Sequence, residues 1–140
     1  MATVHFRDIA KTAILNALKT DIDAGGAAGI LRIYSGAMPA KPEDAITGVL
    51  LGELTLAYPV GSITGVAAAL KLDFSAITQD SSADNGGVAS HFRVFRSDGT
   101  TAVFDGDVTT TGGGGALQLN TTNIVAGGPI LVTAFSVAVP

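Results

Sequence analysis

The sequence predicts a mainly β fold, an antiparallel β-sandwich or jelly-roll-like barrel, preceded by one N-terminal amphipathic α-helix. Apolar residues recur at steps of three and four only near the start of the chain. From about residue 29 onward, short runs of β-branched and aromatic residues alternate with turns rich in glycine. The 140 residues suffice for a single domain, 1–140, which we expect to comprise a helical segment, 1–24, and a β domain, 29–140.

The first segment has the periodicity of a helix with one apolar stripe and one polar side. The stripe consists of Phe6, Ile9, Ala10, Ala13, Ile14, Ala17 and Leu18, and the polar side of Arg7, Asp8, Lys11, Asn16 and Lys19. Gly25 and Gly26 end the helix and, with Gly29, provide a candidate hinge. A helix of about 15 residues is marginal in water by itself, so something must cover the stripe. If the sandwich of the same chain covers the stripe, the helix is a lid on the β domain. If a neighbouring subunit or a shell covers it, the helix is an anchor that attaches the protein, and we favour the anchor.

The rest of the chain predicts strands separated by turns. The expected strands are residues 30–34, 49–56, 70–74, 88–96, 101–108, 116–120 and 130–139. Asp98 and Gly99 lie between two β-rich runs and predict a hairpin turn in which Gly99 has a positive φ. The last strand is apolar on both faces, which favours a place in the middle of a sheet or between two layers.

Composition excludes several classes of protein. The chain is 47% hydrophobic and 14% charged, which excludes intrinsic disorder, and its net charge of −4 argues against a nucleic-acid partner. The chain has no cysteine, so disulfides and thiolate metal sites are excluded. It has neither a run of 18 apolar residues nor a recognisable secretory signal, so no membrane partner is expected. So few charges predict that part of the surface is buried against another protein or another copy.

The sequence predicts no catalytic, cofactor or metal site, and therefore no enzyme. His5 and His91 lack the spacing of a metal-binding pair, and we expect each to be solvent-facing or satisfied. Asp105-Gly106-Asp107 resembles the start of a calcium loop without its later ligands, so bonds from these carboxylates to local backbone amides are favoured. The glycine run 112–115 lacks the lysine of a phosphate loop and is expected to be a flexible tight turn.

Residues 108–140 carry no charge. Charged residues are depleted from interface cores, so this stretch predicts an interface between subunits, with buried strands and turns as the alternative. The candidate interface residues lie on the helical segment and on the last strand. They are Phe6, Ile9, Ile14, Leu18, Leu131, Phe135, Val137 and Val139.

Several segments, taken together and in order, resemble a family of small bacteriophage virion proteins. They are residues 6–18, 31–36 with Pro39, 51–56, 92–100, 105–108, 117–122 and 124–129 with the final apolar strand. The resemblance covers most of the chain, with residues 63–87 less distinctive. It implies a structural component of the virion that is made in the cytoplasm of the bacterial host.

Proteins of this size and composition in such particles are commonly capsid decoration or minor capsid (cement) proteins. The resemblance implies that the chain binds the lattice of the major capsid protein after assembly, stabilises the head by burying apolar surface, and forms a homo-oligomer, a trimer. A tail or baseplate component is the first alternative. A host-surface or carbohydrate-binding module is the second, and it is disfavoured because the chain has no tryptophan and two tyrosines.

Overall fold

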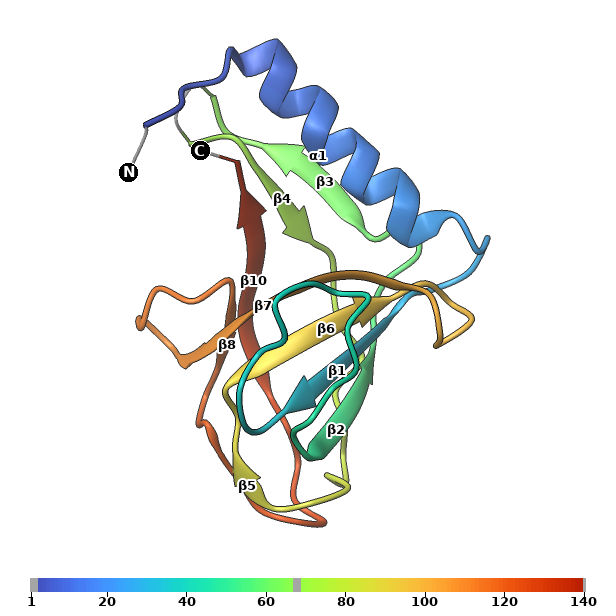
Figure 1. Ribbon diagram of the computed structural model, residues 1–140, viewed down its shortest axis with the longest axis vertical. Helices are drawn as coiled ribbons and strands as arrows, with labels where there is room; N and C mark the ends of the chain where they lie inside the picture. The colour runs from blue at the N-terminus through green and yellow to red at the C-terminus, as the bar shows by residue number, and fades with distance from the viewer. Residues whose placement is uncertain (1–2, 67–68, 140) are drawn as a thin grey trace.

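The computed structural model describes residues 3–66 and 69–139, and within them it has one α-helix and ten strands. The predicted mainly β fold with an N-terminal helix is confirmed (Figure 1). The elements are α1 (Asp8–Asp23), β1 (Ile30–Tyr34), β2 (Leu50–Thr55), β3 (Gly61–Thr64), β4 (Lys71–Phe74), β5 (Gly87–Val88), β6 (His91–Phe95), β7 (Ala102–Thr110), β8 (Leu117–Leu119), β9 (Asn123–Ile124) and β10 (Val132–Ala138).

Eight strands form one sheet in the order β2-β1-β6-β7-β8-β10-β4-β3, and β5 pairs with β9 in a second, small sheet. The large sheet is mixed rather than purely antiparallel, because β7 and β8 pair in parallel. β10 lies between β8 and β4, which confirms the predicted central place of the last strand. β3, a strand of four residues, was not predicted.

The large sheet curls because its first edge strand is tied back to segments near its far end. Thr55 on β2 forms a bridge with Thr78, which follows β4, and Asp80 forms a bridge with Ile130, which precedes β10. The Asp80 carboxylate also accepts a hydrogen bond from the backbone N–H of Glu53 on β2, at 3.1 Å. These contacts give the sheet a barrel-like form and cover the outer edge of β2.

Four phenylalanine rings form a cluster in which Phe92 and Phe135 belong to the main core and Phe74 and Phe104 pack against it, partly buried. Phe92 on β6 is fully buried and makes edge-to-face contacts with Phe104 and Phe135, at centroid distances of 5.5 and 5.0 Å. Phe74 stacks on Phe135 with centroids 3.8 Å apart. A Cβ atom on Gly106 would lie 2.5 Å from the ring of Phe92, so only glycine fits at this point of β7.

The predicted hairpin is confirmed. β6 and β7 pair in antiparallel fashion, and Gly99 in the turn has a φ of +70°. The Asp98 carboxylate accepts hydrogen bonds from the backbone N–H groups of Thr100 and Thr101, both at 2.8 Å, and from the Thr101 hydroxyl, at 2.6 Å. These hydrogen bonds lower the pKa of Asp98 to about 2.

The glycine run forms the connection between β7 and β8. Parallel neighbours usually need a connection of about a dozen residues or more, whereas residues 111–116 join these two strands. Gly112, with a φ of +82°, donates its N–H to the Gln118 side chain at 2.9 Å. Gly115 donates its N–H to the Thr109 hydroxyl at 3.0 Å. The predicted flexible turn is therefore a connection held by hydrogen bonds.

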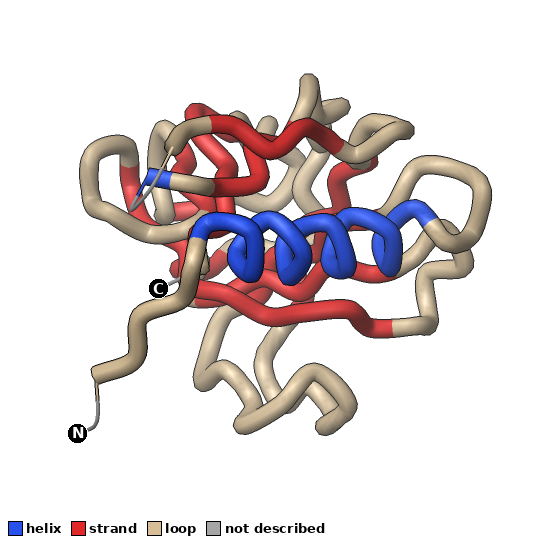
Figure 2. The backbone as a smooth tube through the Cα atoms, turned by 90° about the horizontal axis from the view of Figure 1, so that it is seen from above, coloured by secondary structure: helices blue, strands red, loops and turns tan. Residues whose placement is uncertain are grey.

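Helix α1 lies across β3 and β4 at one end of the molecule (Figures 1 and 2). Leu15 on α1 forms a second hydrophobic cluster with Leu70 and Leu72. Ile22, near the end of the helix, belongs to the main core. Leu18 packs against both clusters, so the helix joins the two.

Candidate interaction surface

The inner face of α1 differs from the stripe that the sequence predicts. The buried helical residues are Lys11, Leu15 and Ile22, and with Leu18 they follow the spacing of one helix face. The prediction that Lys11 lies on the polar side is therefore wrong. A lysine can bury its aliphatic stem while its ammonium reaches water, which composition does not reveal. The spacing of Leu15, Leu18 and Ile22 was the signal available in the sequence.

Most of the predicted stripe forms the opposite side of the helix. We define the outer face of α1 as Ile9, Ala13, Ile14 and Ala17, all of them exposed. Ile9 and Ile14 retain 69% and 43% of their accessible surface, whereas Leu15 and Ile22 retain none. Phe6 lies just before the helix and is 41% exposed. Of the four candidate interface residues in this segment, Leu18 faces the interior and the other three face outward.

The end of α1 is fastened to the β domain. Arg96 at the end of β6 forms an ion pair with Asp21, and the Asp23 carboxylate accepts a hydrogen bond from the backbone N–H of Val60 at 3.1 Å. A Cβ atom on Gly29 would lie 2.9 Å from both Ile22 and the carbonyl oxygen of Phe95. The hinge expected at Gly29 is therefore a close-packed contact, and the helix is part of the core and not only an attachment.

The candidate residues of the last strand lie largely inside the molecule. Phe135 is buried in the main core, and Val137 packs against that core. Val139 packs against the second cluster, and Leu131 is half-buried. These side chains therefore make contacts within one chain, whereas many other residues of the uncharged stretch are exposed, and an interface there stays a prediction.

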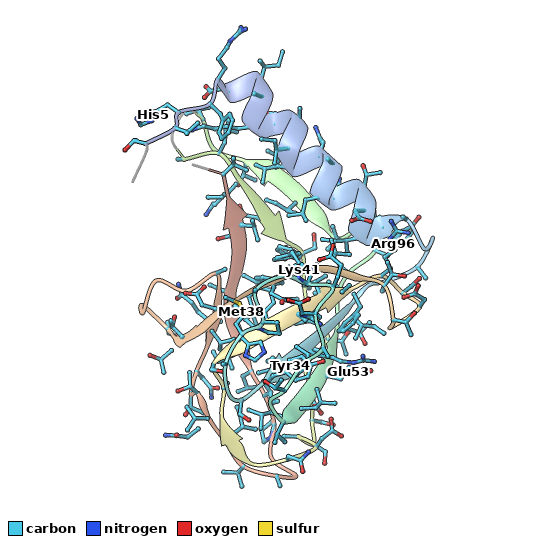
Figure 3. The ribbon with its side chains drawn as sticks, viewed as in Figure 1. His5, Tyr34, Met38, Lys41, Glu53 and Arg96 are labelled. Carbon is cyan, nitrogen blue, oxygen red and sulfur yellow. The ribbon has the colours of Figure 1, made fainter. Side chains whose placement is uncertain are left out.

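A row of charged side chains crosses β2, β1, β6 and β7. The register places Glu53 opposite Arg32, Arg32 opposite Arg93, and Arg93 opposite Asp105. Arg32 donates to the Glu53 carboxylate at 2.7 Å, and its guanidinium lies 4.7 Å from the centre of the Phe95 ring. The loop that joins β1 to β2 crosses this side of the sheet, where Figure 3 labels Tyr34, Lys41 and Glu53.

Arg93 and Asp105 form a buried ion pair beneath this loop, and each side chain is 6% exposed. The guanidinium donates to both carboxylate oxygens, at 2.6 and 2.8 Å, and to the carbonyl oxygens of Asp44 and Lys41, at 2.8 and 3.4 Å. The hydrogen bonds to Asp105 raise the pKa of Arg93. Asp105 therefore pairs with a side chain, contrary to the expectation of a bond to a local backbone amide, and the pair holds the loop in place.

His91 lies beside this pair and is buried rather than solvent-facing. Its ring stacks on Tyr34 with centroids 5.5 Å apart, and its Nδ1 lies 3.1 Å from the Ser90 hydroxyl. Its Nε2 has no hydrogen-bond partner within residues 3–66 and 69–139. Burial lowers the pKa of His91, which keeps the ring neutral at pH 7. The Ser90 hydroxyl also lies within hydrogen-bond distance of the carbonyl oxygens of Tyr34 and Gly36.

The remaining polar residues singled out in the sequence have separate positions. Asp107 accepts a hydrogen bond from the backbone N–H of Ala116 at 3.1 Å, as expected of a carboxylate that bonds a nearby amide. His5 lies in the segment before α1, far from Tyr34 (Figure 3), on which the His91 ring stacks. No group of three or more His, Asp or Glu side chains that could hold a metal ion occurs in the described part of the chain.

Comparison of the chain with protein-family models, with curated proteins and with solved structures finds no match. No helix within the described residues is long and apolar enough to cross a membrane. Function is therefore inferred from the surfaces of this chain, and the outer face of α1 is the candidate interaction surface.

Proposed function

We propose that this protein is a non-enzymatic bacteriophage virion protein, a capsid decoration or minor capsid protein that binds the major capsid protein lattice and stabilises the head. It attaches through the outer face of α1. The observation that carries this proposal is the exposure of Ile9 and Ile14 on a helix whose other face is already packed in the fold. Removing such apolar side chains from water by covering them with a partner contributes favourable free energy to binding.

The positions of the polar side chains support a binding role. Arg93 and Asp105 hold the loop between β1 and β2, Asp98 holds the hairpin turn, and Asp107 holds the connection before β8. Each of these groups is engaged in bonds within the fold. Because these groups hold loops and turns in place, their arrangement suits a rigid scaffold that presents a binding surface to a partner.

The size of the outer face favours attachment in many copies. Full burial of one isoleucine side chain contributes about 1.5–3 kcal/mol, and the outer face has two isoleucines and two alanines. A single copy would therefore bind weakly. Copies that bind a regular lattice and also touch one another gain avidity from their effective concentration. This reasoning supports a homo-oligomer, which we propose to be a trimer.

Counting the copies in purified virions tests the proposal. Quantitative mass spectrometry would measure peptides of this chain relative to the major capsid protein, on heads separated from tails. Hundreds of copies on the heads are expected. A single ring of about six or twelve copies on the tails would instead indicate the tail or baseplate alternative, and absence of the chain from virions would contradict any virion role.

A further inference from the structure

A groove opens where β4 and β10 part. The two strands pair over Ser136↔Asp73, Val137↔Leu72 and Ala138↔Lys71, and their ladder ends there. The next residues in the same register would be Phe74 to Ile77 opposite Val132 to Phe135. These eight residues line an open groove with a volume of about 180 Å³.

The chain leaves β10 at this point because it bonds elsewhere. Ser75 donates its backbone N–H to the carbonyl oxygen of Val60 at 3.0 Å. Thr78 exchanges two backbone hydrogen bonds with Thr55 on β2, at 2.8 and 3.3 Å. The start of β10 therefore has β8 as its strand neighbour on one side and the groove on the other. A strand edge of this kind can accept an extended peptide by backbone pairing.

The groove also has a place for an apolar side chain. Six of its eight lining residues are apolar, and the stacked rings of Phe74 and Phe135 are among them. The groove is open to solvent, so an extended segment could lay one side chain along it. The groove therefore suits an extended segment that carries a phenylalanine.

The chain itself has such a segment, residues 3–7, which we call the arm. The arm precedes α1, is exposed throughout, and leads away from the sheet in Figure 2. Arg7 at its end has extended dihedral angles, with φ of −65° and ψ of 151°. Val4 and Phe6 are apolar at alternate positions and are 56% and 41% exposed, the pattern of a strand that offers one face to a partner.

Charge also favours contact between the arm and another copy. The arm carries Arg7 and no acidic residue, whereas residues 8–140 hold the other seven basic and all twelve acidic residues, a net charge of −5. The arm and the body of the molecule therefore carry net charges of opposite sign, while the residues that line the groove are uncharged.

We propose that the arm of a second copy occupies this groove, pairs with the exposed edge of β10, and lays its Phe6 ring against the apolar side chains that line the groove. Two different surfaces meet in this contact, so copies join head to tail and can close into a ring. The inference rests on the proposed function only in that copies must touch on the particle.

Engineered cysteines test this contact directly, because the chain has none of its own. His5→Cys places a thiol on the arm beside Phe6, and Ala76→Cys places one in the groove. The two single-cysteine proteins are mixed at high concentration and oxidised. Random pairing of equal amounts of the two proteins would give twice as much mixed disulfide as either same-residue disulfide. We expect the mixed 5–76 disulfide to exceed that twofold ratio clearly. Adding Phe6→Ala should lower its yield about fivefold, while the matched change Ile9→Ala should not alter it.

Two outcomes would overturn the inference. One is a yield of the mixed disulfide no greater than for His5→Cys combined with a cysteine at the exposed, distant Val125. The other is closure of the disulfide within one chain of a His5→Cys/Ala76→Cys double variant at high dilution, which would make the chain's own arm the occupant. Both measurements use purified protein. A negative result would therefore contradict the arm contact without bearing on the proposed function, which the copy count in virions tests.

Discussion

The two sides of α1 both carry isoleucine or leucine side chains but have opposite surroundings, and the outer side also exposes Asn16 and Thr20. Leu15 and Ile22 on the inner face are fully buried, whereas Ile9 and Ile14 on the outer face are exposed. A helix that served only to cover a sheet would be polar on its outer face. The difference indicates that the inner face stabilises the fold and that the outer face is available to a partner. One helix can therefore serve as a lid through its inner face and as an anchor through its outer face.

Deletion of residues 1–24 is the change with the largest expected effect. It removes Leu15 from the cluster that contains Leu70 and Leu72, and Ile22 from the main core. We expect the truncated protein to lose its cooperative thermal transition and to bind a dye that reports exposed apolar surface. A truncated protein that melts cooperatively would show that α1 is only an anchor. It would contradict the conclusion that the inner face of α1 stabilises the fold.

Leu15→Ala measures the inner face alone. Leucine-to-alanine changes at fully buried sites cost about 2–5 kcal/mol, through lost burial and the cavity left behind. We expect the free energy of unfolding in urea to fall by about 3 kcal/mol. A loss below about 1 kcal/mol would mean that the second cluster contributes little to stability.

Gly99→Val provides a reference from the hairpin whose turn lies against the end of α1. A Cβ atom on Gly25 would lie 2.0 Å from the Ser97 hydroxyl oxygen, so turn and helix end are in close contact. Gly99 has a φ of +70°, which valine adopts only with strain. We expect a loss of about 1–2 kcal/mol in the same urea assay. Unchanged stability would place the turn in another conformation.

Asp98→Ala in the same turn should cost less than Gly99→Val and should depend on pH. The folded-state pKa of Asp98 is about 2, below its ordinary value of 3.8, so unfolding in acid takes up a proton. The contribution of the carboxylate is fully present above about pH 4 and is lost as the pH falls towards 2. The gap in stability between the two proteins should therefore narrow over that range. A gap that stays constant with pH would show that the ionised carboxylate does not stabilise the turn.

Much of the fold was predictable because its signals are local. The Asp98–Gly99 turn, the alternation in β6 and the glycines after α1 each lie within a few residues of the structure they produce. The faces of α1 were harder to assign because large apolar residues occur on both, and the spacing of Leu15, Leu18 and Ile22 competes with that of Ile9 and Ile14. The interior choice depends on Leu70 and Leu72, which lie about fifty residues further along the chain.

The burial of Arg93 and His91 could not be predicted from neighbouring residues, because it too depends on residues that are distant in the sequence. Arg93 is buried because Asp105 pairs with it and because the loop around Lys41 and Asp44 covers it. Nothing in the residues next to Arg93 indicates this cover. His91 is likewise buried by contacts with Tyr34 and Ser90, one from another strand.

The proposed role of the outer face of α1 is tested most directly by variants that keep the stability of the wild type. What is compared is their binding to particles. Ile9→Ser/Ile14→Ser removes the exposed isoleucines, and Val125→Ser, at an equally exposed site away from the helix, serves as the matched control. Exposed substitutions usually change stability by less than about 0.5 kcal/mol, so both variants should unfold like the wild type. The deciding measurement is the occupancy of each protein on purified particles. We expect the helix variant to be lost from particles and the control to bind at wild-type occupancy. Wild-type occupancy of a folded helix variant would show that the outer face of α1 is not the attachment surface.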